Sequence, residues 1–144
     1  MKKIFTAIFM LLALNLNAQF GMQGSTGFQW NASWVTVPGA GTNSAGLYLF
    51  RKTLTLDAVP ANFIVYVSAD NRYKLYVNET LVSFGPSVSD LQHYNYETVD
   101  LAPFLKQGQN IISARVWNEG DLKPVHQMSL RTGFILQGAS KETQ

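Results

Sequence analysis

The sequence predicts an all-β domain, an antiparallel, jelly-roll-like β-sandwich of about eight strands with one short helical turn. Runs of β-branched and aromatic residues recur between turn-forming residues at intervals of about eight to twelve positions. No segment after the N-terminal stretch has a sustained helical period. The chain has no cysteine, so an apolar core and not a set of disulfides must stabilise the fold.

The N-terminal segment, residues 1–18, is expected to be an export signal and not part of the fold. Lys2 and Lys3 give it a basic start, residues 4–14 are almost wholly apolar, and cleavage is expected after Ala18. The apolar run is shorter than the ~20 residues that a membrane-spanning helix needs. The alternative is a buried N-terminal helix. We expect a secreted protein, periplasmic or extracellular, with no membrane insertion after cleavage.

The charge balance excludes two classes of partner. Lys2 and Lys3 are two of the eleven basic residues, and all nine acidic residues follow the signal, so nine basic and nine acidic residues remain. A neutral domain has no net basic field, so we expect neither a nucleic-acid partner nor anionic lipid. The remaining chain divides into a flexible leader at 19–29, the sandwich domain at 30–138 and a polar tail at 139–144.

The first strands are expected on either side of a glycine-rich loop. Residues 30–37 can form one strand, and residues 46–56 form the longest strand candidate. In the second segment the apolar alternation changes parity between Leu49 and Phe50. We therefore expect a β-bulge near Phe50 that returns the apolar side chains to one face. Residues 63–67 are apolar on both parities, which predicts a central strand covered on both sides.

A hairpin is expected in the middle of the chain. Residues 73–77 alternate between apolar and more polar side chains, which predicts a half-buried strand. Asn78 and Glu79 then turn the chain into a second strand at 81–84. A loop leads from there to a strand-like segment at 92–99.

The C-terminal part is expected to begin with the helical turn. Asp100 can cap a single turn through residues 103–106, which Gly108 ends. Two strands follow, each with one apolar face. The residues of these two faces are Ile112, Ala114, Val116, Met128, Leu130, Phe134 and Leu136.

The sequence shows no recognisable catalytic site, and we expect none. His93 and His126 are its two histidines, neither lies beside a nucleophile motif, and they lack the short spacing of zinc ligands. Several carboxylates lie near expected strand ends, where a glycosidase pair could form, but no spacing requires one. Solvated turn and cap residues are the simpler interpretation.

Side chains at the expected strand ends suit neutral, hydroxyl-rich ligands instead. Aromatic rings offer flat faces, and amide, carboxylate and basic groups offer hydrogen bonds. Each aromatic residue can equally belong to the core or to a sheet surface. The candidate carbohydrate-binding residues are Asp70, Asn71, Arg72, His93, Tyr94, Trp117 and Asn118.

An ordered series of short motifs runs through nearly the whole chain after the signal. The motifs are Phe-Arg-Lys at 50–52, Ala-Asp-Asn-Arg-Tyr-Lys-Leu-Tyr-Val-Asn at 69–78, Gly-Pro at 85–86, the segment 93–110, Val-Trp-Asn-Glu-Gly at 116–120 and Arg-Thr-Gly-Phe at 131–134. In this order they resemble the N-terminal β-sandwich domain of bacterial α-L-rhamnosidases. A single motif would be weak, whereas the ordered series is specific.

The resemblance implies an accessory domain that precedes a catalytic (α/α)-barrel which cleaves terminal rhamnose. It also leaves open a bound calcium ion at Asp70 and Asn71, whose oxygens suit a hard cation; otherwise no cofactor is expected. Two segments depart from the family pattern. The hairpin turn has Asn78-Glu79 in place of Asn-Gly, and Ser-Val-Ser-Asp at 87–90 replaces Ala-Arg-Gly-Asp, which removes a basic side chain.

These observations together predict a non-catalytic carbohydrate-recognition domain of a secreted, α-L-rhamnosidase-like glycoside hydrolase. The chain ends soon after its last strong strand, so we expect a fragment without the barrel. The alternative is a purely structural domain that packs on the catalytic barrel and exposes a continuous apolar patch when alone. The expected partner is therefore a rhamnose-containing glycan or the missing catalytic domain. An independent hydrolase is the third hypothesis.

Overall fold

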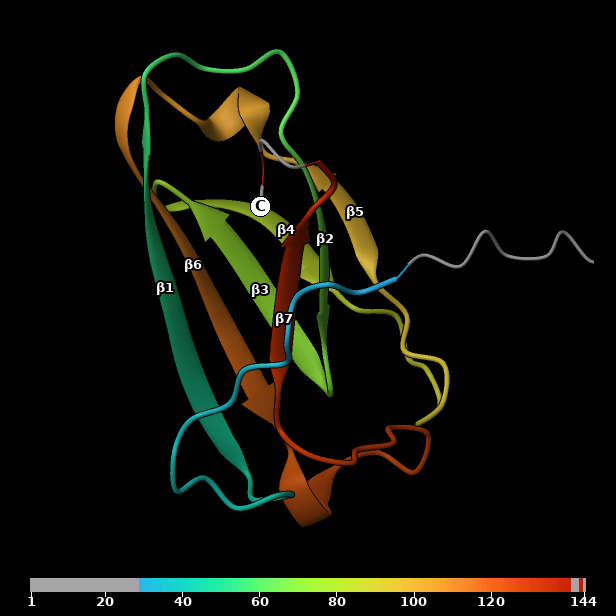
Figure 1. The fold of residues 1–144 in the computed structure, drawn as a ribbon. Coiled ribbons are helices and arrows are strands. Elements are labelled where there is room, and N and C mark those ends of the chain that lie inside the picture. Colours follow the sequence, from blue (N-terminus) through green and yellow to red (C-terminus); the bar gives the residue numbers. More distant parts are fainter. Residues whose placement is uncertain (1–28, 141–142, 144) are drawn as a thin grey trace, which may run out of the picture.

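The computed structural model describes residues 29–140 and residue 143, and these form a two-layer β-sandwich (Figure 1). The predicted all-β, antiparallel fold is confirmed. The expected signal peptide and nearly all of the leader lie outside the described residues. The elements of the described part are β1 (Gly46–Leu56), β2 (Ile64–Ala69), β3 (Arg72–Val77), β4 (Thr80–Gly85), β5 (Glu97–Asp100), the 3-10 turn η1 (Ala102–Phe104), β6 (Gly108–Asn118), the 3-10 turn η2 (Gly120–Leu122) and β7 (Phe134–Gly138).

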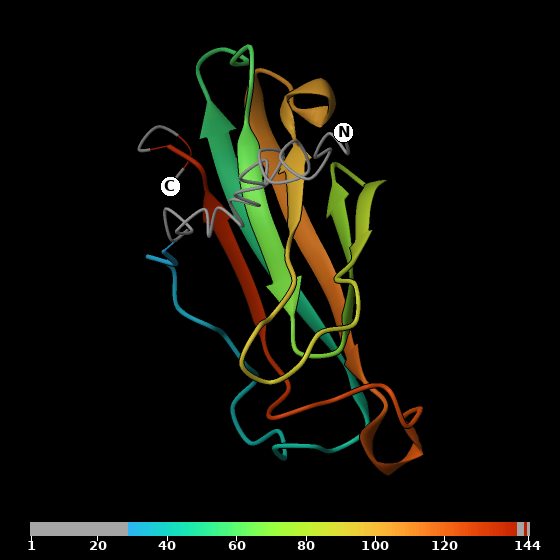
Figure 2. The ribbon, with the colours of Figure 1, turned by 90° about the vertical axis from the view of Figure 1, so that its right-hand side faces the viewer.

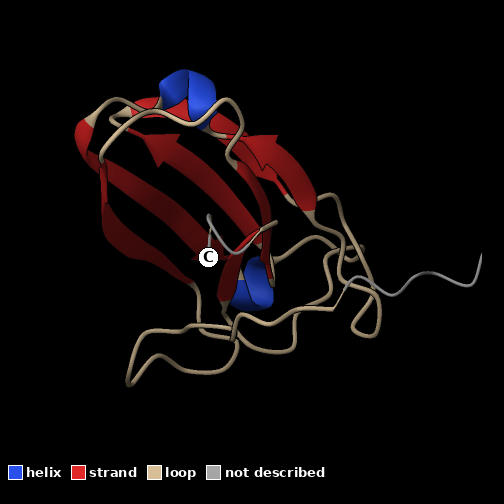
Figure 3. Ribbon diagram, turned by 45° about the horizontal axis from the view of Figure 1, so that its top comes forward, coloured by secondary structure: helices blue, strands red, loops and turns tan. Residues whose placement is uncertain are grey.

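The strands are divided between two antiparallel sheets. One sheet has four strands in the order β1-β6-β3-β4, and the other has three in the order β5-β2-β7. Figure 2 shows the three-stranded sheet lying over the four-stranded one. The two helical turns lie at opposite ends of the sandwich (Figure 3). No helix among the described residues is long and apolar enough to cross a membrane.

The apolar core lies between the sheets because alternate residues of the facing strands are apolar. In β3, for example, Tyr73, Leu75 and Val77 are fully buried, while the residues between them are half-buried on the opposite face. The Phe50 and Phe134 rings stack across the gap between β1 and β7, with centroids 5.5 Å apart. β2 is the middle strand of its sheet, as predicted, but it is not covered on both sides: Val65 and Val67 are fully buried, whereas Ile64 and Tyr66 on the other face are half-buried.

The predicted bulge in β1 is wrong. β1 pairs with β6 along its whole length without a register shift, and the one irregularity of this sheet falls in the β3–β4 pairing, where Val82 of β4 has no partner because Leu75 pairs with Ser83 and Tyr76 with Leu81. Since the alternation of β1 is never interrupted, Phe50 faces the core while Leu47 and Leu49 face solvent. Their exposed fractions are 59% and 70%. The apolar residues on the second parity of β1 therefore form part of the protein surface.

The predicted strand at 30–37 is also wrong. Within this segment Val35 alone pairs, forming a bridge to Phe134 with two backbone hydrogen bonds of 2.9 Å. The backbone N–H groups of Asn31 and Ala32 donate instead to Gln137 Oε1, at 2.6 and 2.9 Å. Because these two N–H groups donate to a side chain, they are not available to the backbone oxygens of a neighbouring strand, and no β-ladder forms here.

Two further strands are shorter than predicted. Of the segment 92–99, only residues from Glu97 onward are extended, as part of β5. Met128 and Leu130 were expected on a core face, but they precede β7 and are 51% and 60% exposed. The reason is that the Leu130 N–H donates to the carboxylate of Asp70 at 2.9 Å, which holds this segment as a loop.

The hairpin agrees with the sequence. A helical turn follows Asp100 as predicted, but it spans Ala102–Phe104 and not residues 103–106, and its N-cap is Leu101. Asn78 and Glu79 both have positive φ, 47° and 72°, as the tight turn between β3 and β4 requires. Asp100 Oδ1 accepts hydrogen bonds from the N–H groups of Ala102, at the start of η1, and of Phe63. Gly108 follows η1 with φ of 86°, a conformation that favours glycine. The second turn, η2, was not predicted.

Candidate functional site

Three loops and one tight turn meet at the end of the sandwich that is lowest in Figure 1. The loops precede β1, connect β4 to β5 and precede β7, and the tight turn connects β2 to β3. Backbone hydrogen bonds connect them: the Thr132 N–H donates to Thr42 O at 2.9 Å, and the Asp70 N–H donates to Gly133 O at 3.1 Å. These loops carry most of the residues that the sequence predicted for ligand binding.

Asp70 lies at the centre of this end of the molecule. Its side chain is almost fully buried, yet both carboxylate oxygens have partners. Oδ1 accepts from the Tyr94 hydroxyl at 2.9 Å and from the backbone N–H groups of Leu130 and Arg131 at 2.9 and 3.4 Å. Oδ2 accepts from Asn71 Nδ2 at 3.2 Å and from the Ser129 hydroxyl. A buried carboxylate is stable only with such donors, and here they fix three chain segments to one point.

Asn118 extends this polar network to the end of β6. Its Nδ2 donates to Ser129 Oγ at 3.0 Å and to Thr132 Oγ1 at 2.9 Å, and its Oδ1 accepts from the Gly120 N–H at 2.8 Å. The side chain is buried, with an exposed fraction of 3%. Asn118 therefore binds neighbouring chain segments and is not available to a ligand.

Tyr94 is held beside Asp70 with its ring against Trp34. The two ring centroids are 5.2 Å apart and the planes are inclined by 58°. Burial raises the pKa of the Tyr94 hydroxyl above its ordinary value, and the hydrogen bond to Asp70 and the negative charge of that carboxylate raise it further. The 2.9 Å hydrogen bond from this hydroxyl to Asp70 Oδ1 holds the ring in its orientation.

The two rings line a pocket of ≈ 390 Å³ between the loops. Its remaining surface is mixed: several threonines and Arg131 provide polar groups, and Val35 and Leu130 provide apolar ones. Trp34 is 42% exposed, so part of its ring is accessible from solvent. The full lining is Trp34, Val35, Thr36, Thr42, Asp70, Tyr94, Leu130, Arg131, Thr132 and Gly133.

The other predicted site residues lie away from this pocket. The Arg72 guanidinium donates to the backbone oxygen of Pro86, and Trp117 lies on the outer face of the four-stranded sheet. There its ring stacks on Phe84 with centroids 6.2 Å apart. Of the seven candidates, only Asp70 and Tyr94 line the pocket. Asn71 and Asn118 belong to the polar network around Asp70 and Ser129, and Arg72, His93 and Trp117 lie elsewhere.

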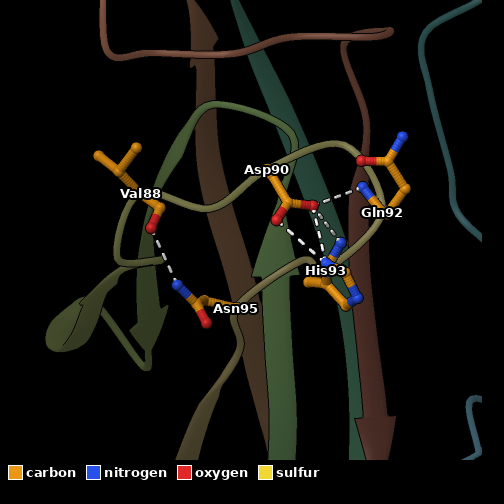
Figure 4. A network of polar contacts seen from close by, with 5 residues as sticks. All are labelled: Val88, Asp90, Gln92, His93 and Asn95. Atoms are coloured by element: carbon orange, nitrogen blue, oxygen red, sulfur yellow. Dashed lines mark hydrogen bonds and ion pairs between the residues drawn. The ribbon is translucent and has the colours of Figure 1, made fainter.

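His93 belongs to a small local network in the loop between β4 and β5 (Figure 4). Asp90 Oδ1 accepts from the N–H groups of Gln92 and His93 at 2.8 and 2.7 Å, and the His93 ring lies 3.0 Å from the same carboxylate. These hydrogen bonds, that of the His93 ring first, lower the pKa of Asp90. Asn95 Nδ2 donates to Val88 O at 2.9 Å. The network shapes an exposed loop.

The donors around Asp70 and Asn71 do not fit calcium. The ion needs six to eight oxygen ligands, but N–H and O–H groups surround the carboxylate of Asp70. Asn71 Oδ1 is buried without a hydrogen-bond partner, and a single amide oxygen is too little for a hard cation. Residues 29–140 and 143 contain no cluster of three or more His, Cys, Asp or Glu side chains that could hold a metal.

Sequence reasoning missed the residues that complete the pocket. Trp34 was assigned to a strand, and Thr36, Thr42 and Arg131 were not considered as ligand contacts. Trp34 follows a polar stretch and precedes the Pro-Gly turn, which is a signal for an exposed loop aromatic. The threonines carry no such signal. Thr36 and Thr42 lie in the loop before β1, and only its contact with the loop before β7 brings them beside Arg131.

Solved structures similar to this chain include three rhamnosidases. The GH78 family rhamnosidase of Bacillus sp. GL1 matches 78% of this chain with 26% identity and a TM-score of 0.69. The Dictyoglomus thermophilum α-L-rhamnosidase matches 81% with 17% identity and a TM-score of 0.59, and the Streptomyces avermitilis enzyme, complexed with L-rhamnose, matches 77% with 20% identity and a TM-score of 0.53. No protein-family model and no curated protein sequence matches the chain.

The match covers only a small part of each enzyme. It spans 12% of the Bacillus chain, 15% of the Dictyoglomus chain and 11% of the Streptomyces chain. That share corresponds to one β-sandwich domain and not to a whole hydrolase. The resemblance to a β-sandwich domain of bacterial α-L-rhamnosidases, which the ordered motifs predicted, is thereby confirmed.

Proposed function

We propose that this chain is the non-catalytic carbohydrate-recognition domain of a secreted, α-L-rhamnosidase-like glycoside hydrolase, and that the pocket lined by Trp34 and Tyr94 binds the sugar. The observation that carries the proposal is the aromatic pair, 5.2 Å apart, beside a pocket that also contains threonines and an arginine. Similarity to part of three rhamnosidases supports the enzyme class.

The pocket lining matches the two surfaces of a sugar. The C–H face of a pyranose ring packs on an aromatic plane, and the partly exposed Trp34 ring provides one. Hydroxyl groups of the sugar need donors and acceptors, which Thr36, Thr42 and Arg131 provide. Rhamnose also carries a methyl group in place of the terminal hydroxymethyl group of hexoses. Val35 and Leu130 give that methyl group an apolar contact.

The polar network beneath the pocket supports a preorganised site. Asp70 fixes the Tyr94 hydroxyl at 2.9 Å and the Leu130 N–H at 2.9 Å, so two parts of the lining are held before any ligand arrives. A site that is ordered in advance loses less conformational entropy on binding. Asp70 and Asn118 thus act as positioning residues, and the sugar contacts come from the lining side chains.

Calorimetry with L-rhamnose and rhamnose-containing oligosaccharides tests the proposal. We expect a Kd on the order of millimolar for the monosaccharide, and a loss of about tenfold or more in Trp34→Ala, equivalent to about 1.4 kcal/mol. Arg131→Ala is expected to weaken binding less. Trp117→Ala is the matched control, because its ring is aromatic but lies outside the pocket lining.

Two outcomes would reject this function. One is the absence of heat with any of these sugars at millimolar concentration. The other is equal affinity for Trp34→Ala and the unmodified chain. Treatment with EDTA is expected to leave the affinity unchanged, because the donors around Asp70 do not fit calcium.

A further inference from the structure

The outer face of the four-stranded sheet combines exposed apolar side chains with basic ones. The antiparallel register places Leu49, Arg115, Lys74 and Phe84 in one row across the four strands. We call this surface the outer sheet face. Its residues are Leu47, Leu49, Arg51, Arg72, Lys74, Leu81, Phe84, Arg115 and Trp117.

The apolar part of the outer sheet face is large and accessible. Leu47, Leu49, Leu81 and Phe84 have exposed fractions of 59%, 70%, 49% and 58%. Trp117 is half-buried because its ring stacks on Phe84 above β3. Neighbouring rows of the sheet carry these side chains, so they form a cluster and not scattered single residues. Clustered apolar groups on a soluble domain mark an interaction surface.

The charge on this sheet has one sign. The four strands contain five basic residues, Arg51, Lys52, Arg72, Lys74 and Arg115, and no aspartate or glutamate. All but Lys52 lie on the outer sheet face, and one carboxylate, that of Glu79 in the β3–β4 turn, lies near its border with Arg51 and Arg115. None of the five forms an ion pair with a carboxylate in the part of the chain that the structure describes. The neutral balance of the whole domain therefore conceals a local excess of positive charge on one face.

We propose that the outer sheet face docks a protein surface whose apolar centre is bordered by carboxylates. Arginine, tryptophan and phenylalanine are enriched in protein interfaces, and basic side chains without an ion-pair partner favour a partner surface of complementary negative charge. Exposed leucines favour a protein over a glycan, because branched aliphatic side chains offer no flat face to a sugar ring. A second copy of this chain is disfavoured, since a symmetric contact would bring like charges together.

The docking surface and the sugar pocket share no residue, so the two proposals can fail independently. The outer sheet face is formed by strands, whereas the pocket is formed by loops. A variant of the outer sheet face should therefore keep the sugar affinity of the unmodified chain. Calorimetry with L-rhamnose on the same variants separates failure of one proposal from failure of the other.

A selection experiment with protein partners of varied surface tests the docking proposal. The probe is a displayed library of small helical domains that carry a randomised surface, selected on the immobilised full chain. We expect most independent binders to compete with one another and to carry an excess of Asp and Glu together with apolar residues.

Substitutions then locate the binding surface. Leu49→Asp and Arg115→Glu are each expected to weaken these binders about tenfold or more. The matched controls are Leu122→Asp, at an exposed residue of η2, and Lys123→Glu, at the half-buried residue beside it, and they are expected to change affinity less than twofold. Replacing a binder's carboxylates by lysine should restore part of its affinity for Arg115→Glu.

Several results would overturn the docking proposal. Binders that are insensitive to Leu49→Asp and Arg115→Glu, or that show no excess of acidic residues, would contradict it. Co-sedimentation with vesicles of phosphatidylserine and phosphatidylcholine that Arg115→Glu abolishes would assign the face to a membrane. A dimer in analytical ultracentrifugation that Leu49→Asp dissociates would assign it to a second copy.

Discussion

The loop end of the sandwich buries polar side chains, whereas the outer sheet face exposes apolar ones. At the loop end, Asp70 and Asn118 are buried, with exposed fractions of 5% and 3%, and their polar atoms are paired with neighbouring loops. On the outer sheet face, Leu49 and Phe84 are largely exposed. Buried polar groups hold the fold together at one place, and exposed apolar groups remain for a partner at the other.

The contrast shows that residue type alone does not identify a binding surface. A carboxylate and an amide near strand ends suggest a ligand site, yet here they serve the loops themselves. An apolar residue in a strand suggests the core, yet Leu47 and Leu49 face solvent because β1 keeps its alternation. In both cases the contacts made within the fold decide the role. The polar side chains find hydrogen-bond partners in neighbouring loops and are buried, whereas the two leucines lie on the outer sheet face and stay exposed.

The largest effect on stability is expected for Asp70→Ala, which tests whether the buried polar groups at the loop end hold the fold together. The variant leaves several buried donors without an acceptor, and each such group costs ~1–3 kcal/mol. We expect a loss of at least about 3 kcal/mol in the free energy of unfolding, measured by urea denaturation. Asp90→Ala is the control, because that carboxylate serves an exposed loop. A loss below 1 kcal/mol for Asp70→Ala would contradict the structural role.

A smaller decrease in the free energy of unfolding is expected at alkaline pH, because the buried tyrosine of β3 ionises less readily in the folded state than in the unfolded chain. Burial, and to a lesser degree Glu97, raise the pKa of Tyr73 to about 12, against an opposing hydrogen bond from Ser83. The unfolded chain releases this proton near its ordinary pKa of about 10, so the folded state binds more protons between the two values. The stability is therefore complete below pH 10 and decreases as pH rises toward 12.

Urea denaturation at a series of pH values measures this decrease. Tyr73→Phe has no phenol to ionise at this position, so its stability should depend less on pH over the same range. Its stability at neutral pH should be lower, because the 2.9 Å hydrogen bond to Ser83 is lost. Identical pH profiles for the variant and the unmodified chain would contradict the assignment to Tyr73.

An effect of about 1 kcal/mol is expected for the aromatic stack on the outer sheet face. Stacked aromatic pairs contribute ~0.5–1.5 kcal/mol beyond their buried area. A double-mutant cycle with Trp117→Ala and Phe84→Ala should give a coupling energy in that range, read from chemical denaturation. Additive effects of the two substitutions would show that the rings do not interact in solution.

The smallest effect is expected for Leu49→Thr. The side chain is 70% exposed and threonine suits a strand, so the change in stability should stay within ~0.5 kcal/mol. Leu75→Ala is the buried counterpart in β3 and is expected to cost ~2–5 kcal/mol. Similar losses in the free energy of unfolding for the two variants would contradict the assignment of Leu75 to the core and of Leu49 to the docking surface.

The parts of the fold that the sequence predicted are those with local causes. Asn78 and Glu79 form the turn because the two residues after β3 must adopt positive φ, and Asp100 orders η1 through neighbouring N–H groups. The predicted strand at 30–37 fails for a non-local reason, because Gln137, more than a hundred residues away in sequence, binds its backbone.

The candidate site was predicted less completely than the fold. Tyr94 was named from the sequence, but its aromatic partner Trp34 was not, since sixty positions separate them and no short-range pattern connects them. Asp70 was named for ligand binding, whereas its oxygens accept hydrogen bonds from the loop before β7. A sequence does not show which hydrogen-bonding side chains will be paired with a distant segment of the folded chain and which will remain available to a ligand.

The sequence by itself determined the all-β class, the β3–β4 hairpin and the resemblance to a rhamnosidase domain, because alternation and turn chemistry act over a few residues. Only the tertiary structure decided which polar residues are buried and hydrogen-bonded within the protein and which apolar residues are exposed to solvent. The physical reason is that burial and hydrogen-bond satisfaction depend on partners distant in the chain. Net charge behaves in the same way: its sum is fixed by composition, but its concentration on one face of the β1-β6-β3-β4 sheet follows from strand pairing.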